Sequence, residues 1–185
     1  ILEVRFGAGS VLLNDARTLV RAAAERAKPD SQRLPEFSPS RLASTQRAVL
    51  AEAPVHPVLE ELAIRFWLDK TREYLGADNA AVKALFGSRT STEIAREIIA
   101  SSLIGDAGFR RKLWDNPALA GSSSDPAIAL VRRVDAATRA ARDKYEAAVS
   151  GPGSIAAEKV AGLRFDVMGQ EIYPDATFTL RLSYG

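Results

Sequence analysis

Apolar residues recur at intervals of three and four along most of the chain, and this spacing predicts α-helices. Leu12, Ala16 and Leu19 lie on one face of an early helix, and Ile94 and Ile98 repeat the spacing later. The pattern therefore predicts a mainly helical protein. Further stripes of the same kind run over 42–50, 82–86, 109–113, 130–148 and 156–167.

Residues that favour helix N-termini stand at the borders of these stripes. Ser10, Ser38 and Asp125 are expected N-caps, because a short polar side chain can accept the backbone N–H groups that a first turn leaves unpaired. Thr90 and Glu93 have the spacing of a capping box. Proline follows both Ser38 and Asp125, as expected at the first position of a helix.

Other residues mark where helices stop. Pro29 and Gly76 are expected to end two of them, and Asp78 would cap the short helix that follows Gly76. Gly105 is expected to end one helix and Asp106 to begin the next. The run 151–153, Gly-Pro-Gly, is expected to break the helix that begins after Asp125.

The segment 57–75 is apolar on more than one side, which predicts a helix at the centre of the core. One group of apolar residues comprises Leu59, Leu62 and Phe66, and the other comprises Ile64, Leu68 and Leu75.

The two ends of the chain alternate between apolar and polar residues instead. Residues 177–184 alternate strictly, and Leu2, Val4 and Phe6 alternate more weakly with Glu3 and Arg5. A period of two predicts half-buried strands. The expected fold is therefore mainly α, a multi-helix, bundle-like single domain over residues 1–185 with short β-strands at the two termini.

The composition is that of a globular protein. The chain has 185 residues, 46% of them hydrophobic, and 25 basic against 23 acidic residues leave a net charge of +2. No apolar run approaches the roughly 20 residues that a transmembrane helix needs, so no membrane partner is expected. A charge this small does not predict nucleic-acid binding.

Few residues could carry catalysis. Cysteine is absent, which excludes disulfides, thiolate metal sites and a cysteine nucleophile, and His56 is the single histidine. The run 121–125, Gly-Ser-Ser-Ser-Asp, superficially resembles a nucleophile loop, but Asp125-Pro126 makes a helix N-cap the better interpretation. His56 has no identifiable catalytic partner, so a structural role at the start of a helix is favoured.

The charged residues are equally unspecific. Glu60 and Glu61 are paired carboxylates, and a short basic run covers 110–112. A longer basic stretch comprises Arg132, Arg133, Arg139 and Arg142. Helix-surface roles are commoner than phosphate binding for such residues. The sequence assigns no catalytic, cofactor-binding or metal-ligating residue, and no cofactor.

Several blocks along the chain are distinctive when taken in order. The final run 173–185, YPDATFTLRLSYG, is the most distinctive block. The others are ERAKPD with RLPE (25–36), APVHP with EEL (53–62), REYLGAD (72–78), LIGDAGFRRKLW (103–114) and SDPAIAL (124–130). In this order the blocks resemble the helical domain of bacterial serine dipeptidyl peptidases 7 and 11, which are chymotrypsin-like exopeptidases with an inserted α-helical domain.

The resemblance implies a lid over an active site between two β-barrel lobes, which removes dipeptides from the N-terminus of peptides. Peptide substrates would reach it through the catalytic barrels of a parent protein, which would be a homodimer and periplasmic or secreted. The family's catalytic histidine and aspartate precede this region and its catalytic serine follows it, so none of the three is carried over here. His56 does not match the catalytic histidine motif.

The resemblance also accounts for a chain that begins at Ile1 without a signal peptide, as an excised insertion would. Two alternatives stay open. One is a free-standing helical module that binds a partner protein without catalysis, and the other is a weak nucleic-acid binder that uses the basic stretch.

Overall fold

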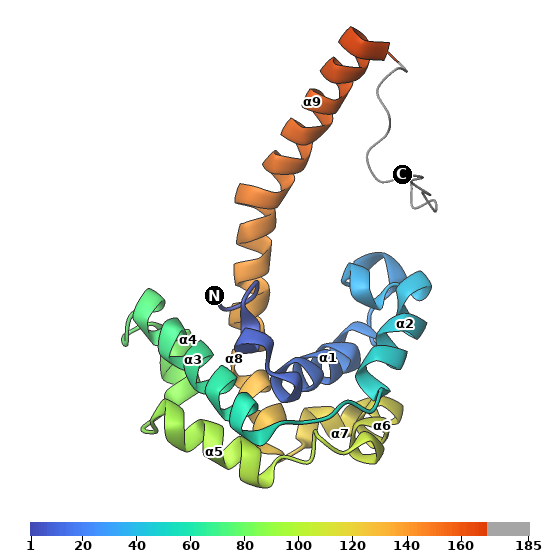
Figure 1. Ribbon diagram of the computed structural model, residues 1–185. Coiled ribbons are helices and arrows are strands. Elements are labelled where there is room, and N and C mark those ends of the chain that lie inside the picture. The colour runs from blue at the N-terminus through green and yellow to red at the C-terminus, as the bar shows by residue number, and fades with distance from the viewer. Residues whose placement is uncertain (170–185) are drawn as a thin grey trace, which may run out of the picture. The chain divides into compact units, whose positions relative to one another are not determined.

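The computed structural model describes residues 1–169, and these contain helices and turns but no strand (Figure 1). The chain divides into two compact units, Ile1–Arg142 and Asp143–Gly185. No helix of the described part has both the length and the apolar character needed to cross a membrane.

The first unit is a set of short helices around one apolar core. Its principal helices are α1 (Val11–Glu25), α2 (Pro39–Leu50), α3 (Pro57–Leu75), α4 (Ala80–Phe86), α5 (Ser91–Ser101), α6 (Ala107–Asp115), α7 (Pro117–Ser122) and α8 (Pro126–Tyr145), of which the last three residues belong to the second unit. Short 3-10 turns lie at Phe6–Gly9, Asp30–Gln32 and Pro35–Phe37.

Trp67 of α3 lies at the centre of this core and is completely buried. Its ring packs on Phe6, with the ring centroids 4.7 Å apart, and its Nε1–H donates to the carbonyl oxygen of Ile1. α3 packs along α5, and α8 adds Ile128 and Val131 to the same buried cluster. The mainly α prediction is therefore confirmed.

Most of the expected helix starts are confirmed. Ser10, Thr90, Asp106 and Asp125 each accept a backbone N–H in the first turn that follows, and Glu93 closes the capping box with Thr90. Gly76 ends α3 with a φ of 81°, a conformation that glycine adopts without a steric penalty. The expected cap of α4 is displaced by one residue, because Asn79 rather than Asp78 accepts the Ala81 N–H.

The strand predicted at the N-terminus is wrong. Residues 3–5 form a turn in which the Phe6 N–H donates to the Glu3 carbonyl at 3.2 Å. Gly7, Ala8 and Gly9 then all have positive φ angles, which turn the chain again before α1. Leu2 and Phe6 are buried while Val4 is exposed, so the alternation does not separate two faces of a sheet. The strand predicted over 177–184 lies outside the described residues.

The second unit is described as far as residue 169, and its main element is α9 (Gly151–Met168). The break expected at 151–153 is wrong, because residues 146–150 form one π-helical turn and helical geometry continues into α9. In that turn the Gly151 N–H donates to the Glu146 carbonyl, and a Cβ on Gly151 would lie only 2.9 Å from this oxygen. The wider π-helical turn thus changes which backbone carbonyls accept hydrogen bonds just before Pro152. Pro152 itself has no N–H to donate.

Candidate functional site

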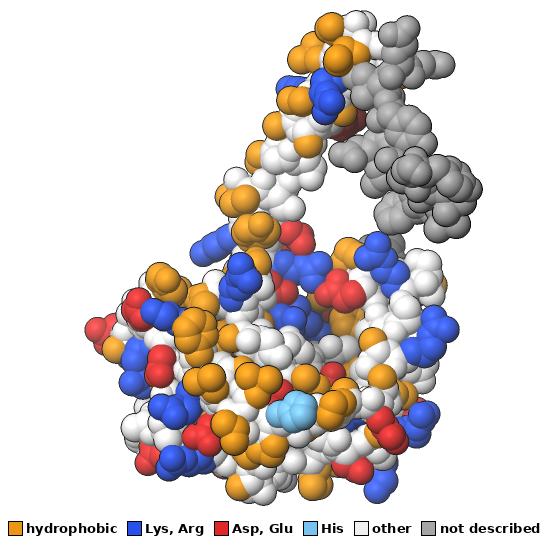
Figure 2. Space-filling model, viewed as in Figure 1, with side chains coloured by type: hydrophobic (Ala, Val, Ile, Leu, Met, Phe, Trp, Pro, Cys, Tyr) orange, Lys and Arg blue, Asp and Glu red, His pale blue; other side chains and the backbone are white. Residues whose placement is uncertain are grey.

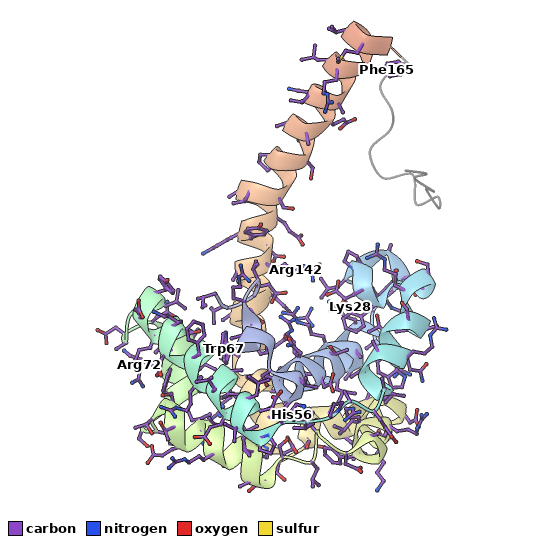
Figure 3. The ribbon with its side chains drawn as sticks, in the orientation of Figure 1. Lys28, His56, Trp67, Arg72, Arg142 and Phe165 are labelled. Atoms are coloured by element: carbon purple, nitrogen blue, oxygen red, sulfur yellow. The ribbon has the colours of Figure 1, made fainter. Side chains whose placement is uncertain are left out.

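No hydrogen bond joins the single histidine to the serine run 122–124 among the described residues. His56 is exposed at the start of α3 (Figure 3), and no hydrogen bond joins it to a serine or a carboxylate among residues 1–169. Ser122 donates to the Ala118 carbonyl of its own helix. The described part of the chain therefore contains no assembled Ser-His-Asp set.

Asp125 has the capping role that the sequence predicts. Its Oδ1 accepts from the Ala127 N–H at 2.9 Å, and its Oδ2 accepts from the Leu103 N–H at 2.7 Å. Ser102 donates its hydroxyl to the same carboxylate. One side chain thus fixes the start of α8 against the end of α5.

The adjacent carboxylates of Glu60 and Glu61 do not act as a pair. Glu60 is buried against the N-terminus of α1, where it accepts from the Ser10 hydroxyl at 2.6 Å and the Val11 N–H at 2.9 Å. Glu61 instead forms surface ion pairs with Arg65 and Arg96. No cluster of carboxylates or histidine able to hold a metal ion occurs in the described residues.

The basic run 110–112 is divided between core and surface. Arg110 is buried and donates to the carbonyl oxygens of Val49 and Ala51, each at 2.6 Å, and to that of Ile104 at 2.7 Å. Arg111 and Lys112 are exposed. Arg110 therefore joins α6 to the end of α2, and it is not available to a phosphate.

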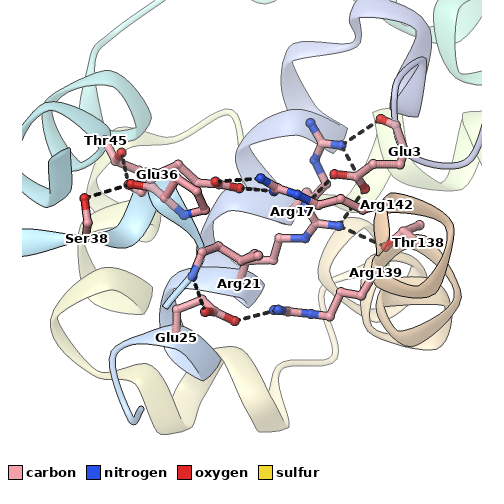
Figure 4. Close-up of polar contacts among 12 residues, drawn as sticks. Glu3, Arg17, Arg21, Glu25, Glu36, Ser38, Thr45, Thr138, Arg139 and Arg142 are labelled. Atoms are coloured by element: carbon pink, nitrogen blue, oxygen red, sulfur yellow. Dashed lines mark hydrogen bonds and ion pairs between the residues drawn. The ribbon is translucent and has the colours of Figure 1, made fainter. Parts of the chain in front are cut away.

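The longer basic stretch contributes two arginines, Arg139 and Arg142, to a partly buried charge network (Figure 4). At its centre, Arg21 donates to both carboxylate oxygens of Glu3, at 2.8 and 2.7 Å, and to Asp135 at 3.0 Å. The carboxylates of Glu3 and Asp135 outweigh the burial of Arg21 and raise its pKa. A forked guanidinium matches this bidentate geometry better than an ammonium would.

Glu25 is the most enclosed carboxylate of this network. Burial raises its pKa, but hydrogen bonds from Lys28, the Leu34 N–H and Arg139 outweigh that effect, so its pKa is below the ordinary value. These contacts measure 2.7, 2.8 and 2.5 Å. Glu25 therefore holds the segment after α1 against α8.

Glu36 forms the third centre of the network through two hydrogen bonds from Arg142. Burial raises its pKa, but the Arg142 guanidinium outweighs burial and lowers it. Arg17, Arg21, Arg139 and Arg142 each have a carboxylate partner among Glu3, Glu25, Glu36 and Asp135. Charges satisfied in this way position chain segments, and they leave no free acid or base for catalysis.

A pocket of about 760 Å³ lies between the first nine residues, α1 and the C-terminal half of α3. We call it the N-terminal pocket. Its walls combine cationic and aromatic side chains. It is lined by Ile1, Val4, Arg5, Phe6, Ala8, Gly9, Asn14, Arg17, Phe66, Lys70 and Tyr74.

The other surface of note is an apolar stripe on α3. Leu59, Leu62 and Phe66 are 60%, 62% and 54% exposed, while Ile64 and Leu68 on the opposite face are fully buried. Figure 2 shows hydrophobic side chains gathered on both sides of His56, at the start of this helix. α3 thus lies in the core, as its apolar pattern predicts, but only through the face of Ile64 and Leu68, while its second apolar face meets solvent.

The chain matches the Peptidase S46 family over residues 1–185. It belongs to that family. The Peptidase S46 match confirms the resemblance stated from the sequence blocks, and it makes the chain a peptidase-related domain. Comparisons with curated proteins and with solved structures give no match.

The sequence pattern singled out Glu60 and Arg110 but predicted helix-surface roles for them, whereas both are buried in this Peptidase S46 domain, and it did not indicate the N-terminal pocket. A signal for the first two existed. Glu60 stands four residues before Ile64 on the buried stripe of α3, and Arg110 stands four before Trp114. A charged residue in register with core positions indicates a buried charge that needs partners. The pocket had no such signal, because its walls come from three separate segments.

Proposed function

We propose that residues 1–185 form the helical lid of a serine dipeptidyl peptidase that removes dipeptides from the N-terminus of peptides. The lid gates the cleft and limits which substrates reach it. The catalytic histidine, aspartate and serine lie in the parent protein outside these residues. A closed lid would also exclude water from the reacting groups.

One observation carries the proposal, namely that the Peptidase S46 match covers a chain whose described part is helical and contains no catalytic set. Peptidase chemistry by a Ser-His-Asp set requires a base within hydrogen-bond reach of the nucleophile. His56, the single histidine of the chain, has no such partner among residues 1–169. The domain therefore contributes by controlling access of peptides to the cleft and by shaping that cleft.

The apolar stripe of α3 supports packing against another protein domain. Leu59, Leu62 and Phe66 lie on one face at helical spacing, and clustered exposed apolar residues mark interaction surfaces. In the proposed enzyme the stripe packs on the catalytic lobes. The parent would act on peptides outside the cytoplasm, in the periplasm or after secretion, as a homodimer.

The test uses the whole product of the reading frame that contains this chain. Dipeptide release is measured by mass spectrometry on peptides of 4 to about 20 residues, with free and with acetylated N-termini. We expect release from free N-termini, with turnover that falls as the peptide lengthens. The double variant Leu59→Ser/Leu62→Ser should weaken the dependence on length, while the surface variant Lys83→Ser should leave it unchanged.

The alternative is a helical interaction module without catalysis, and the same exposed stripe favours it. Absence of dipeptide release from the whole product would support this alternative and overturn the lid. Hydrolysis by residues 1–185 alone would contradict both, because neither assigns catalytic groups to this chain.

A further inference from the structure

The N-terminal pocket combines a positive charge with an apolar lining. Arg5, Arg17 and Lys70 are its charged lining residues, and no carboxylate lines it. Glu3 pairs with Arg17 at 3.7 Å and Glu73 pairs with Lys70 at 2.7 Å, but neither carboxylate belongs to the lining. The interior therefore favours an anionic group.

The three cations differ in how they are held. Arg17 is fixed by hydrogen bonds to the Glu3 carbonyl and the Asn14 side chain, each at 3.3 Å, and its guanidinium stacks over Phe6 at 4.6 Å. Lys70 has one surface partner, Glu73. The Arg5 side chain forms no hydrogen bond or ion pair with any residue of the described part. The pocket thus contains one prepositioned cation and one whose side chain has no partner among residues 1–169.

The apolar walls are built from side chains that are otherwise unusually exposed. Val4, Phe66 and Tyr74 are between about half and three-quarters exposed, and all three line the pocket. Phe6, in contrast, is buried and rests on Trp67, which gives the pocket a rigid floor. An apolar group that entered here would cover aromatic surface that now meets water.

The rim is a bend held in an uncommon backbone conformation. Ala8 has a φ of 47°, which a residue with a Cβ rarely adopts. Its N–H donates to the Arg5 carbonyl at 3.1 Å, and the Ser10 N–H donates to the Gly7 carbonyl at 2.8 Å. Backbone strain of this kind concentrates at ligand sites, where the surrounding structure maintains it.

We propose that the N-terminal pocket binds the carboxyl-terminal end of a peptide, with the terminal carboxylate on Arg5, Arg17 and Lys70 and an apolar side chain among Phe6, Phe66 and Tyr74. A volume of about 760 Å³ lies within the range of small-ligand sites and accommodates one or two residues. The peptide nature of the ligand rests on the proposed function. The charge and the aromatic lining do not.

Such a site would hold the distal end of a short substrate while its N-terminus is cleaved elsewhere. Peptides just long enough to span the two points would gain affinity from both, and longer peptides would gain less. The lid would then select short peptides by attraction as well as by steric exclusion.

The test measures binding to the 185-residue chain directly, by calorimetry and by the fluorescence of Trp67, which touches Phe6 and Ile1 of the pocket. The probe is a hexapeptide ending in phenylalanine with a free carboxylate, and the control ligand is the same peptide with a C-terminal amide. We expect the amide to bind at least about fivefold more weakly, since each charge-assisted contact contributes on the order of 1 kcal/mol.

Two variants and a matched control locate the site. Arg5→Gln and Lys70→Gln should each weaken binding of the free carboxylate about three- to tenfold, without changing the weaker binding of the amide. Arg133→Gln removes the same charge from another pocket, which shares no lining residue with this one, and should leave the affinity unchanged. Circular dichroism would show that the variants are folded.

Equal affinity for the peptide with a free carboxylate and the peptide with an amide would overturn the proposal. So would a double variant, Arg5→Gln with Lys70→Gln, that binds the free carboxylate as tightly as the natural chain does. Absence of binding by either peptide would overturn it as well. Tighter binding of inorganic phosphate than of the peptide would assign the pocket to a different ligand. None of these results bears on dipeptide release by the whole protein, so failure of the pocket is distinguishable from failure of the lid.

Discussion

Glu60 places a buried carboxylate at the first turn of α1. Its two oxygens accept from the Ser10 hydroxyl and from the N–H groups of Val11 and Leu12. A helix N-terminus carries partial positive charge and unpaired donors, so a carboxylate there is well solvated by the protein. Glu60 thereby joins α3 to α1 across fifty positions of sequence.

Glu60→Ala should destabilise the first unit by about 2–4 kcal/mol, because two buried donors and one partly buried donor lose a charged acceptor. Glu61→Ala, at the adjacent position, removes only surface ion pairs and should change stability by less than about 1 kcal/mol. Urea unfolding followed by circular dichroism measures both. Equal losses would show that Glu60 is not the acceptor described here.

Asp15 gives the stability of the chain a pH dependence near neutrality. Burial raises the pKa of its carboxyl from 3.8 to about 6, while Arg110 of α6 opposes the rise and Glu60 of α3 adds to it. A pKa that is higher in the folded than in the unfolded chain favours the protonated native state. The contribution of Asp15 is therefore fully present below about pH 4 and is lost as the pH rises through about 6.

Asp15→Asn should remove this part of the pH dependence. Relative to the natural chain, the variant should gain stability between pH 4.5 and pH 7.5, because an amide does not titrate. Thermal melts at a series of pH values measure the difference in Tm. A difference that stays constant across this range would contradict the raised pKa.

Hydrogen bonds between residues close in sequence could be predicted from the sequence, while those between residues far apart in sequence could not. Ser10, Thr90 and Asp125 cap helices within three residues of themselves, and their spacing was enough to predict this. Glu60 and Arg110 bond to residues about fifty to sixty positions away. Their partners depend on how the helices pack, which no local pattern specifies.

At the scale of the element, α3 has two apolar faces, of which one is buried and the other is exposed. The predicted bounds, 57–75, match the helix, yet periodicity could not say which face the core would take. Ile64, Trp67 and Leu68 pack inside, and Leu59 and Leu62 remain outside. The sequence could identify an apolar surface but not whether its partner lies within these residues.

Truncations on the two faces of α3 should therefore differ sharply. Leu68→Ala opens a cavity in the core and should cost about 2–5 kcal/mol. Leu62→Ala removes an exposed side chain and should change stability by less than about 0.5 kcal/mol. Urea unfolding of residues 1–185 measures both. A large loss for Leu62→Ala would mean that this face is already covered within the chain.

The predictions for residues 2–6 and for the helix break at 151–153 were wrong for a different reason. Alternation at 2–6 fits a strand, but positive φ angles at Gly7, Ala8 and Gly9 redirect the chain. Pro152 fits a helix break, but the π-helical turn before it changes the local hydrogen bonding. In both places backbone geometry over a few residues overrides the side-chain pattern.

At the scale of the molecule, the charge network joins the first 37 residues to α8 within the first unit. Glu25 and Glu36 both have pKa values below the ordinary 4.5. For a carboxyl with a lowered pKa, stability is present above the unfolded value and is lost as the pH falls through the folded one. Their effect is thus opposite in sign to that of Asp15 and acts at lower pH.

Glu25→Gln should make the first unit less stable at pH 7 and less sensitive to acid. The natural chain should lose more stability than the variant between pH 5 and pH 3, because only the natural chain protonates this buried side chain. Glu52→Gln, at an exposed position, is the matched control. Guanidinium unfolding at fixed pH values provides the comparison, and parallel acid profiles for Glu25→Gln and the natural chain would refute the assignment.

The same network determines when the chain can finish folding during its synthesis. Arg21 and Glu25 leave the ribosome early, but Asp135 and Arg139 follow them by 114 residues. At the usual 5–20 residues per second, these early charges wait for several seconds or more without their final partners. Residues 1–37 therefore reach their native contacts only after α8 has been made, and nascent chains that stop short of α8 should remain sensitive to protease.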